Sequence, residues 1–323
     1  MIGTSIYDFL TQAEKADVIN RTQTLDVSDA VQEALDYVAD NRSRCPMGTL
    51  LAPAGTYRLD KPIRQSSRVL LIGAGQGRTE PFTPPNTEFT YWGMPDEMWV
   101  FGANGGPVNT TGGGIKRCQF NARAAATAAL VIRDATAFVL EDLEIANGTM
   151  RGLYLNNTPT QPYPTFNFYC RNVSVFQRGW QTPNANGIEL YTPWPCTIPA
   201  GIAKALWDGI TIQHANGAGL KITGGDNHQW NNLFTFRDNS ETGPGVWFAT
   251  PNEDGITSGG HLFLNPACSG GMRFDHAHAF LGTRIVNLDD YDLNIGTQAI
   301  FGDAADAVVA TTQSGKCYGK QCT

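Results

Sequence analysis

A short motif that recurs through residues 112–302 constrains the fold more than any other feature of the chain. In each copy a small residue precedes an apolar–any–apolar triplet, and in most copies a second short strand follows. The copies begin at Ala129, Gly152, Gly187, Gly219, Gly245, Gly271 and Ala299. Their spacing runs from 23 residues (129 to 152) to 35 residues (152 to 187), which is typical of the structural unit of a repeat protein.

The strands of these copies alternate in polarity, and Asn-, Gly- and Asp-rich turns separate them without a helical segment. This pattern excludes βαβ crossovers. Gly makes up 35 of the 323 residues and charged residues only 16%, which favours a turn-rich β protein. We therefore predict an all-β fold, a single right-handed parallel β-helix with one rung per copy. A sandwich or a propeller is the rival architecture, but a propeller blade needs about four strands per repeat.

The N-terminal segment 1–47 has a different pattern, which is helical. Apolar residues recur at spacings of three and four from Val27 to Val38, and Ser28 or Asp29 suits the N-cap position. We expect this helix to cap the coil. The β-helix is assigned to 48–302, with a long loop at about 80–112 where Pro, Gly, Trp and Met occur without periodicity, and 303–323 is expected to be a C-terminal tail.

Charge and composition exclude several classes of function. The net charge is −7 and the isoelectric point about 5.2, and no basic stripe interrupts this balance, so nucleic acid is not an expected partner. No apolar run reaches the roughly 18 residues of a membrane span. The first basic residue is Lys15, so the start of the chain lacks the charged region of a signal peptide.

The cysteines and glycine-rich segments give no sign of a metal or another cofactor. The seven Cys are scattered and include no CxxC pair, which favours buried free thiols, although Cys317 and Cys322 could close a small loop. The GAGQG sequence after Val69 lacks the GK[ST] ending of a phosphate-binding loop. We expect no cofactor and no metal.

Motifs in the first quarter of the chain carry a resemblance to known proteins. The chain reads Asp29-Ala-Val-Gln-Glu-Ala-Leu-Asp, then Gly48-Thr-Leu-Leu-Ala-Pro-Ala-Gly-Thr-Tyr-Arg-Leu, then Val69-Leu-Leu-Ile-Gly-Ala-Gly. A capping helix followed by a PAGTY strand pair resembles the opening of pectate-lyase-like (pectin lyase fold) β-helix proteins. The preceding segment from Ser5-Ile-Tyr-Asp-Phe-Leu-Thr is similar to bacteriophage tailspike and tail-fibre proteins. The chain lacks the common FGA-x-GDG opening and an obvious trimerisation domain after the last rung.

The resemblance implies a homotrimeric virion protein of a phage tail, synthesised in the host cytoplasm without a signal peptide. Such a protein contacts other phage tail proteins and binds a bacterial surface polysaccharide. Its relatives include hydrolases, lyases, esterases and inert binders, so the fold alone does not select an activity.

Stacked rungs convert equivalent sequence positions into columns on the surface. The middle residue of each triplet points outward, which gives a column of Val131, Tyr154, Glu189, Lys221, Trp247, Arg273 and Phe301, with Tyr191 in the next column. Aromatic faces suit sugar rings, and Lys and Arg pair with acidic groups. We predict that the substrate-binding residues are Tyr154, Glu189, Tyr191, Lys221, Trp247 and Arg273. The same column could instead be a solvated face or a contact between subunits.

Acidic residues and His recur in the turns that follow the same strand in three successive rungs. The turns read Gly225-Asp226-Asn227-His228, Asn252-Glu253-Asp254 and Asp275-His276-Ala277-His278. Clustered carboxylates can provide one protonated acid beside one ionised base. We predict that Asp226, Glu253, Asp254 and Asp275 are catalytic and that His228 and His276 bind substrate. The alternatives are ordinary turn residues or a divalent metal, which the alternation of Asp275 and His276 on an extended strand disfavours.

Three functions are compatible with these patterns. The first is a phage depolymerase that cleaves polysaccharide by glycosidic hydrolysis between paired carboxylates, which work at about 5–5.5 Å in retaining and 6.5–9.5 Å in inverting enzymes. The second is a non-catalytic virion or receptor-binding protein. The third is a free bacterial polysaccharide lyase that would use Lys221, Arg273, His276 or Tyr191, and the absence of a basic cluster makes it less favoured than hydrolysis.

Overall fold

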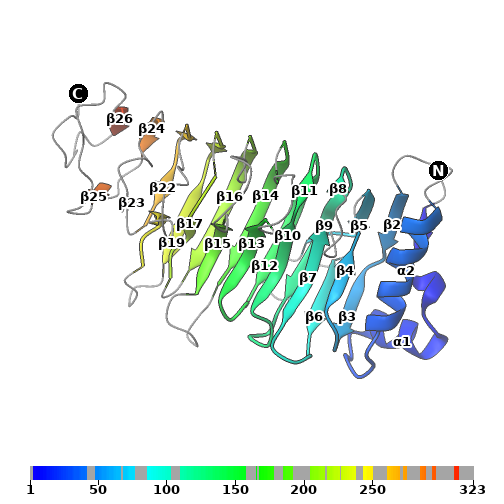
Figure 1. Ribbon diagram of the computed structural model, residues 1–323. Coiled ribbons are helices and arrows are strands. Elements are labelled where there is room, and N and C mark those ends of the chain that lie inside the picture. The colour runs from blue at the N-terminus through cyan, green and yellow to red at the C-terminus, as the bar shows by residue number, and fades with distance from the viewer. Residues whose placement is uncertain are drawn as a thin grey trace.

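Parallel strands stack rung upon rung along the chain in the computed structural model (Figure 1). The structure describes residues 3–41, 48–66, 68–76, 86–102, 110–157, 165, 167–177, 185–191, 204–214, 217–225, 227–237, 243–249, 260–269, 272–274, 284–288, 293–295 and 309–312. Successive rungs contribute one or two strands to the larger of two long sheets and one strand to the smaller, and strands of successive rungs pair in parallel register. The predicted all-β parallel β-helix is confirmed.

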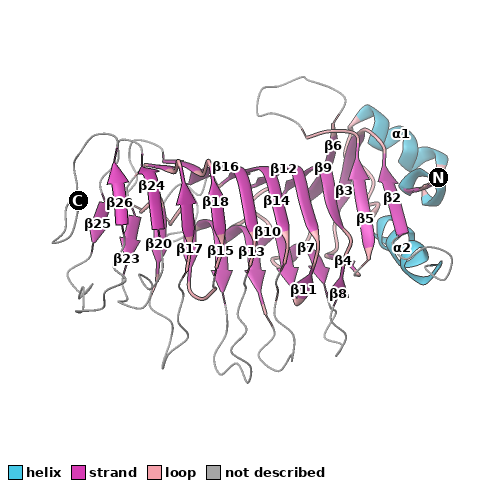
Figure 2. Cartoon of the chain, turned by 90° about the horizontal axis from the view of Figure 1, so that it is seen from above, coloured by secondary structure: helices cyan, strands magenta, loops and turns pink. Residues whose placement is uncertain are grey.

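Two helices cover the N-terminal end of the coil, α1 (Gln12–Asn20) and α2 (Ser28–Asp40), after a 3-10 turn, η1 (Ile6–Phe9) (Figure 2). Ser28 begins α2 instead of capping it. The Ser28 hydroxyl accepts hydrogen bonds from the backbone N–H groups of Asp60 (2.9 Å) and Lys61 (3.0 Å), which tie the helix to the first rungs. The predicted helical cap is confirmed. Within the described residues, no helix is long and apolar enough to cross a membrane.

The larger sheet, here called sheet A, has fifteen strands. They are β1 (Thr4–Ser5), β2 (Gly48–Ala52), β3 (Gly55–Leu59), β5 (Val69–Gly73), β6 (Thr87–Tyr91), β9 (Gly114–Asn121), β12 (Val139–Ala146), β14 (Tyr169–Phe176), β16 (Leu206–His214), β18 (Gln229–Asn231), β19 (Phe234–Arg237), β21 (Leu262–Leu264), β22 (Ala267–Cys268), β24 (Arg284–Leu288) and β26 (Val309–Thr312).

The second sheet, here called sheet B, has nine strands and carries the candidate site. They are β4 (Ile63–Gln65), β7 (Glu97–Gly102), β10 (Ala128–Arg133), β13 (Arg151–Asn156), β15 (Asn186–Tyr191), β17 (Leu220–Ile222), β20 (Val246–Phe248), β23 (Met272–Phe274) and β25 (Leu293–Ile295). A further pair, β8 (Thr110–Thr111) and β11 (Ala135–Thr136), lies beside them.

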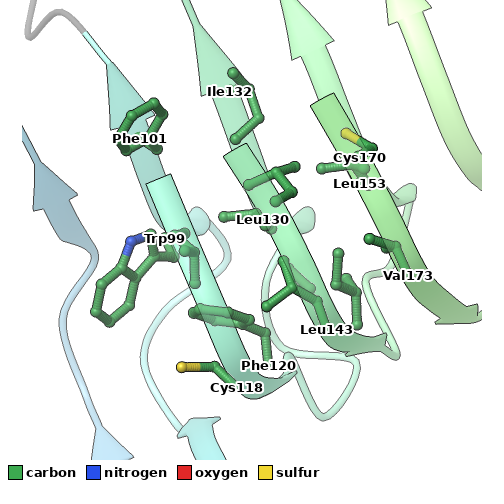
Figure 3. Packing of buried hydrophobic residues seen from close by; sticks show 14 of the residues in the cluster. Trp99, Phe101, Cys118, Phe120, Leu130, Ile132, Leu143, Leu153, Cys170 and Val173 are labelled. Carbon is green, nitrogen blue, oxygen red and sulfur yellow. The ribbon is translucent and has the colours of Figure 1, made fainter. Parts of the chain in front are cut away.

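The core fills the interior of the coil with ladders of like residues from successive rungs. Figure 3 shows Leu130 and Ile132 of sheet B facing Leu143 and Phe120 of sheet A, all fully buried. The described cysteines Cys118, Cys170 and Cys268 are buried free thiols, and burial raises the pKa of each. All three are fully buried, so these thiols serve packing.

Steric contact between neighbouring rungs explains why a small residue opens each copy of the sequence repeat. A side chain on Gly187 would meet the Cγ2 atom of Ile212 and would lie 2.6 Å from the carbonyl oxygen of Gly219 in the next rung. Gly152 and Gly245 approach the next rung's carbonyl oxygens in the same way. The repeat is therefore recognisable in the sequence because the chain turns tightly into sheet B at this position.

Sheet A contains a column of left-handed residues that bends six successive rungs at the same point. The column consists of Arg117, Asp142, Asn172, Gly209, Asn232 and Asn265, all with φ between 50° and 64°. Asn172 Nδ2 donates to Asp142 Oδ1 at 2.7 Å, and Asn265 Nδ2 donates to Asn232 Oδ1 at 3.3 Å. Asn and Asp tolerate this conformation, so side-chain hydrogen bonds join the rungs along this line.

Two boundaries differ from the sequence expectations. The predicted loop at about 80–112 contains β6 and β7, whose Phe89 and Trp99 are fully buried in the core. Thr87 and Thr90 of β6 are buried, and β7 is buried at every residue from Met98 to Gly102, so neither strand shows the polar–apolar alternation of a half-buried strand in the sequence. At the other end, β26 pairs with β24, so sheet A continues past residue 302 into the predicted tail.

Candidate functional site

The predicted outward column forms a continuous line across sheet B. Tyr154, Glu189, Lys221, Trp247 and Arg273 are register partners on β13, β15, β17, β20 and β23. Their neighbours along each strand belong to the interior core, which places this column on the outer face. The predicted register of these five residues is confirmed, whereas their role in binding stays a prediction.

The column extends further than the sequence indicated at its N-terminal end and differs at its C-terminal end. Val131, Val100 and Arg64 precede Tyr154 in register. After Arg273 the partner is Asn294 on β25, so the placement of Phe301 in this column was wrong. The last triplet was misplaced because Leu293-Asn-Ile has no small residue directly before it.

Glu189 is a nearly buried carboxylate held by three partners. Arg151 Nε donates to Glu189 Oε2 at 2.6 Å, Asn186 Nδ2 donates to the same oxygen at 3.1 Å, and Lys221 Nζ lies 3.5 Å from Oε1. The Glu189 side chain is only 5% exposed. A buried carboxylate needs such compensation, so Glu189 orders the cations around it and is committed to them.

Glu97 repeats this arrangement near the N-terminal end of the same face. Its oxygens lie 2.5 Å from Arg133 Nη2 and 3.3 Å from Arg64 Nη1. Arg133 Nε also donates to Asn156 Oδ1 at 3.2 Å. Sequence reasoning placed Arg133 in the next outward column but missed Arg64, Glu97 and Arg151 as members of the face. Glu97 was missed because β7 was not recognised as a strand.

Trp247 lies between two cations from the neighbouring rungs. Lys221 Nζ and Arg273 Cζ are each 5.0 Å from the centre of the Trp247 ring. The two cations come from the strands on either side of β20, one on each. Arg273 is exposed, whereas Lys221 and Trp247 are partly buried. The end of the column nearest the C-terminus therefore presents cations and an aromatic ring to the surface.

Tyr154 belongs to a small apolar cluster on the outer face, with Val100, Ala128 and Val131. The Tyr191 ring packs 6.4 Å from the Tyr154 ring, and Arg151 lies over Tyr154 at 4.1 Å. Burial raises the pKa of Tyr154 to about 12. The Tyr154 phenol stays neutral near pH 7, so it suits packing and hydrogen bonding better than proton abstraction.

His228 does not belong to the surface, and its assignment to substrate binding was wrong. Its side chain is 1% exposed inside the coil, where its ring stacks on His261 at 5.3 Å. Trp207 Nε1 donates to His228 Nδ1 at 3.1 Å. A turn sequence does not reveal whether a residue beside it points inward or outward, and here the indole partner holds the ring in the core.

The predicted catalytic corner falls outside the described residues. This applies to Asp226, Glu253, Asp254 and Asp275, and also to His276. Their catalytic and binding roles stay predictions. Among the residues that the structure does describe, no group of three or more His, Cys, Asp or Glu side chains is arranged to hold a metal ion.

No protein-family profile and no curated protein sequence matches the chain. Solved structures match its fold instead. The ORF18 protein of Geobacillus virus E2 is 13% identical with a TM-score of 0.52, and the match covers 92% of this chain and 58% of that protein. The pre-mature gene product 12 of bacteriophage phi29 is 14% identical with a TM-score of 0.57 over 95% of this chain and 40% of that protein.

An enzyme has the same fold. The catalytic unit of a thermostable GH87 α-1,3-glucanase from Streptomyces thermodiastaticus is 15% identical with a TM-score of 0.54, over 89% of this chain and 53% of that unit. The chain thus spans about half the length of these structures. At such identities the likeness establishes the fold alone, and this chain is a parallel β-helix protein whose coil is shared with phage proteins and with the catalytic unit of a glucanase.

Proposed function

We propose that the chain is a phage tailspike-type protein that binds a bacterial surface polysaccharide along the outer face of sheet B and hydrolyses it. One observation carries the binding proposal: Tyr154, Glu189, Lys221, Trp247 and Arg273 follow one another in unbroken register. Strands in a sheet are about 4.8 Å apart, so the face offers one contact group per rung to a repeating polymer. The phage proteins and the glucanase that share the fold support this choice.

A linear face of this kind suits a polymer better than a small ligand. Aromatic rings and charged side chains recur along the coil axis, and each contact adds a small increment to the affinity. A polysaccharide would run along this axis and engage several rungs together. The ion pairs around Glu97 and Glu189 hold the long side chains in place before binding, which lowers the entropic cost of ordering them.

Hydrolysis is assigned to the corner of Asp226, Glu253, Asp254 and Asp275. The two described carboxylates of sheet B, Glu97 and Glu189, are both engaged by two cations, so neither is suited to act as a general acid. The corner supplies four further carboxyl groups, in the turns that follow the sheet B strands in the sequence. One protonated and one ionised carboxyl group would then share the cleavage step.

Glu97 and Glu189 are each paired with two cations and are therefore poor acid catalysts. This also supports a second candidate function, a virion protein that binds glycan without cleaving it. A lyase is less favoured, because burial raises the pKa of Tyr154 and keeps its phenol neutral, so it is a poor base for proton abstraction. In the proposal the protein acts in the virion as a homotrimer attached to other tail proteins, with no nucleic-acid or membrane partner.

The test is incubation of the protein with purified capsular and O-antigen polysaccharides, followed by size-exclusion chromatography and an assay of new reducing ends. We expect shorter chains without an ultraviolet-absorbing unsaturated end, which elimination would leave. Asp226→Asn, Glu253→Gln, Asp254→Asn and Asp275→Asn should include at least one variant that binds polymer but does not shorten it. Retained cleavage in all four would remove the corner as the site, and binding without cleavage by the unmodified protein would select the second candidate.

A further inference from the structure

The outer face of sheet B carries an excess of positive charge on an acidic protein. Among its described residues, the charged side chains are Arg64, Arg133, Arg151, Lys221 and Arg273 against Glu97 and Glu189. The five cations exceed the two carboxylates by three, while the whole chain has a net charge of −7. The described part of this face therefore has the opposite sign of charge to the chain as a whole.

The outer face of sheet A shows that stacking alone does not require such an excess. Its corresponding column runs Lys116, Glu141, Arg171, Asp208, with the sign alternating from rung to rung. Glu141 pairs with Lys116 at 2.6 Å and lies 3.8 Å from Arg171. Alternation is what stability favours in a parallel ladder, since like charges on neighbouring strands repel. The imbalance on sheet B is thus a property of that face.

The excess is concentrated at the end formed by β17, β20 and β23. Arg151 holds Glu189 at 2.6 Å, whereas Lys221 lies 3.5 Å from it, so the carboxylate is satisfied mainly by Arg151. Lys221 and Arg273 are spaced by the Trp247 ring between them. Lys221 and Arg273 are the charged residues of these three strands, and a cation–π contact leaves the donor N–H groups of a cation able to bind an anion at the ring edge.

We infer that the polymer recognised by this face is acidic, and that Lys221 and Arg273 bind carboxylate groups on its sugars with Trp247 between them. The inference rests on the proposed function and specifies its substrate class. A guanidinium forms two parallel hydrogen bonds with a carboxylate, and an ammonium adds a point charge. Uronate- or sialate-containing polysaccharides supply such groups at regular intervals.

The experiment measures binding by affinity electrophoresis to alginate, hyaluronate and polysialate, to a set of acidic capsular polysaccharides, to the carboxyl-reduced form of each, and to neutral dextran. The variant is Lys221→Met/Arg273→Gln. The matched control, Lys116→Met/Arg171→Gln, removes the same two charges from sheet A. Arg273→Gln alone keeps the test valid if the double variant folds poorly, because Arg273 is exposed.

We expect at least one acidic polymer to bind tenfold or more tightly than its carboxyl-reduced form. That preference should fall at least tenfold in the sheet B variant and less than twofold in the sheet A control. Equal binding of the reduced and acidic forms would overturn the inference, as would equal losses in both variants. Tight binding of neutral polymers would overturn the inference and leave the proposed function standing, whereas no binding to any polysaccharide would remove both.

Discussion

The indole Nε1 of Trp207 donates a hydrogen bond of 3.1 Å to Nδ1 of His228 in the interior of the coil. An acceptor at Nδ1 requires the neutral imidazole with its proton on Nε2. The neighbouring ring of His261 is stacked on His228, and its Nε2 lies 3.1 Å from the carbonyl oxygen of Gly225. Two uncharged imidazoles are therefore part of the core, and their neutrality is a condition of the fold.

This condition predicts acid sensitivity near pH 6. Burial, together with the nearby His228, lowers the pKa of His261 well below its ordinary value of 6.5. Below pH 6.5 the unfolded chain binds a proton that the folded chain does not, so stability is complete above pH 6.5 and falls as the pH falls. The expected loss for one ring is about 1.4 kcal/mol per pH unit, measured by urea unfolding between pH 7.5 and 5.5.

The variant His261→Phe is the control for this effect. Its absolute stability is expected to be lower because the Gly225 carbonyl loses its ring partner, but its pH slope should flatten by about one proton. Asp17 does not interfere. Burial raises the pKa of Asp17, but hydrogen bonds from Thr22 and Thr24 outweigh this effect and lower it overall. The contribution of Asp17 to stability is therefore lost only below about pH 4. An unchanged slope in His261→Phe would contradict the assignment.

Gly187 should be intolerant of any side chain. A Cβ atom there would meet Ile212 and would lie 2.6 Å from the Gly219 carbonyl oxygen, so Gly187→Ala is expected to destabilise by about 1–3 kcal/mol. The comparison is Gly209→Ala, where the nearest atom to a Cβ is 3.9 Å away and only the left-handed backbone opposes the change. Thermal unfolding of both variants measures the difference, and a smaller loss at Gly187 than at Gly209 would refute the steric account.

Gly209 offers a stabilising substitution. Gly209 interrupts the column of left-handed Asn and Asp residues in sheet A. Because Gly209 has no side chain to bond with, Asn232 Nδ2 donates instead to Asp208 Oδ1 at 3.5 Å. Asn tolerates φ near 64° and would restore a side chain between Asn172 and Asn232. We expect Gly209→Asn to stabilise the protein by about 0.4–1 kcal/mol in urea unfolding, and Gly209→Val to destabilise it. Loss of stability in Gly209→Asn would show that the column has no favourable side-chain coupling.

The rungs from β10 onward were predictable because each repeats the same local requirement for a small residue before its sheet B strand. The tight approach at Gly187 requires a small residue, and the triplets beside it alternate inward and outward, so the register of Tyr154 with Glu189 follows from the sequence. The rung of β6 and β7 was not predictable in this way. In β6 the polar residues Thr87 and Thr90 are buried, and β7 is buried at every residue from Met98 to Gly102, so neither strand shows the polar–apolar alternation that marks a strand.

The site was predictable only in part for a related reason. Alternation determines which residues of a strand point outward, but it does not determine the direction of side chains in the turn after the strand. His228 follows such a turn, and its side chain lies inside the coil. Long-range pairing is also invisible in one sequence. Nothing local links Arg151 with Glu189, which are 38 residues apart, although this pair organises the centre of the face.

Glu189→Gln is expected to change stability and affinity in opposite directions. The side chain is 5% exposed and neutralises Arg151 and Lys221, so loss of its charge leaves two cations poorly compensated and should cost about 1–3 kcal/mol in urea unfolding. The same loss increases the positive excess of the face. Binding of acidic polysaccharide should therefore tighten several-fold at low salt, and the gain should shrink as salt is raised.

Glu141→Gln provides the matched control because Glu141 also lies between two cations, Lys116 and Arg171, but on sheet A. It removes the same charge from the protein and is more exposed, at 24%, so we expect a stability loss below about 1 kcal/mol and no change in affinity. If both variants tighten binding equally, net charge alone determines affinity, and sheet B has no special role. If Glu189→Gln weakens binding while the protein remains folded, Glu189 contacts the polymer directly and does not merely position the cations around it.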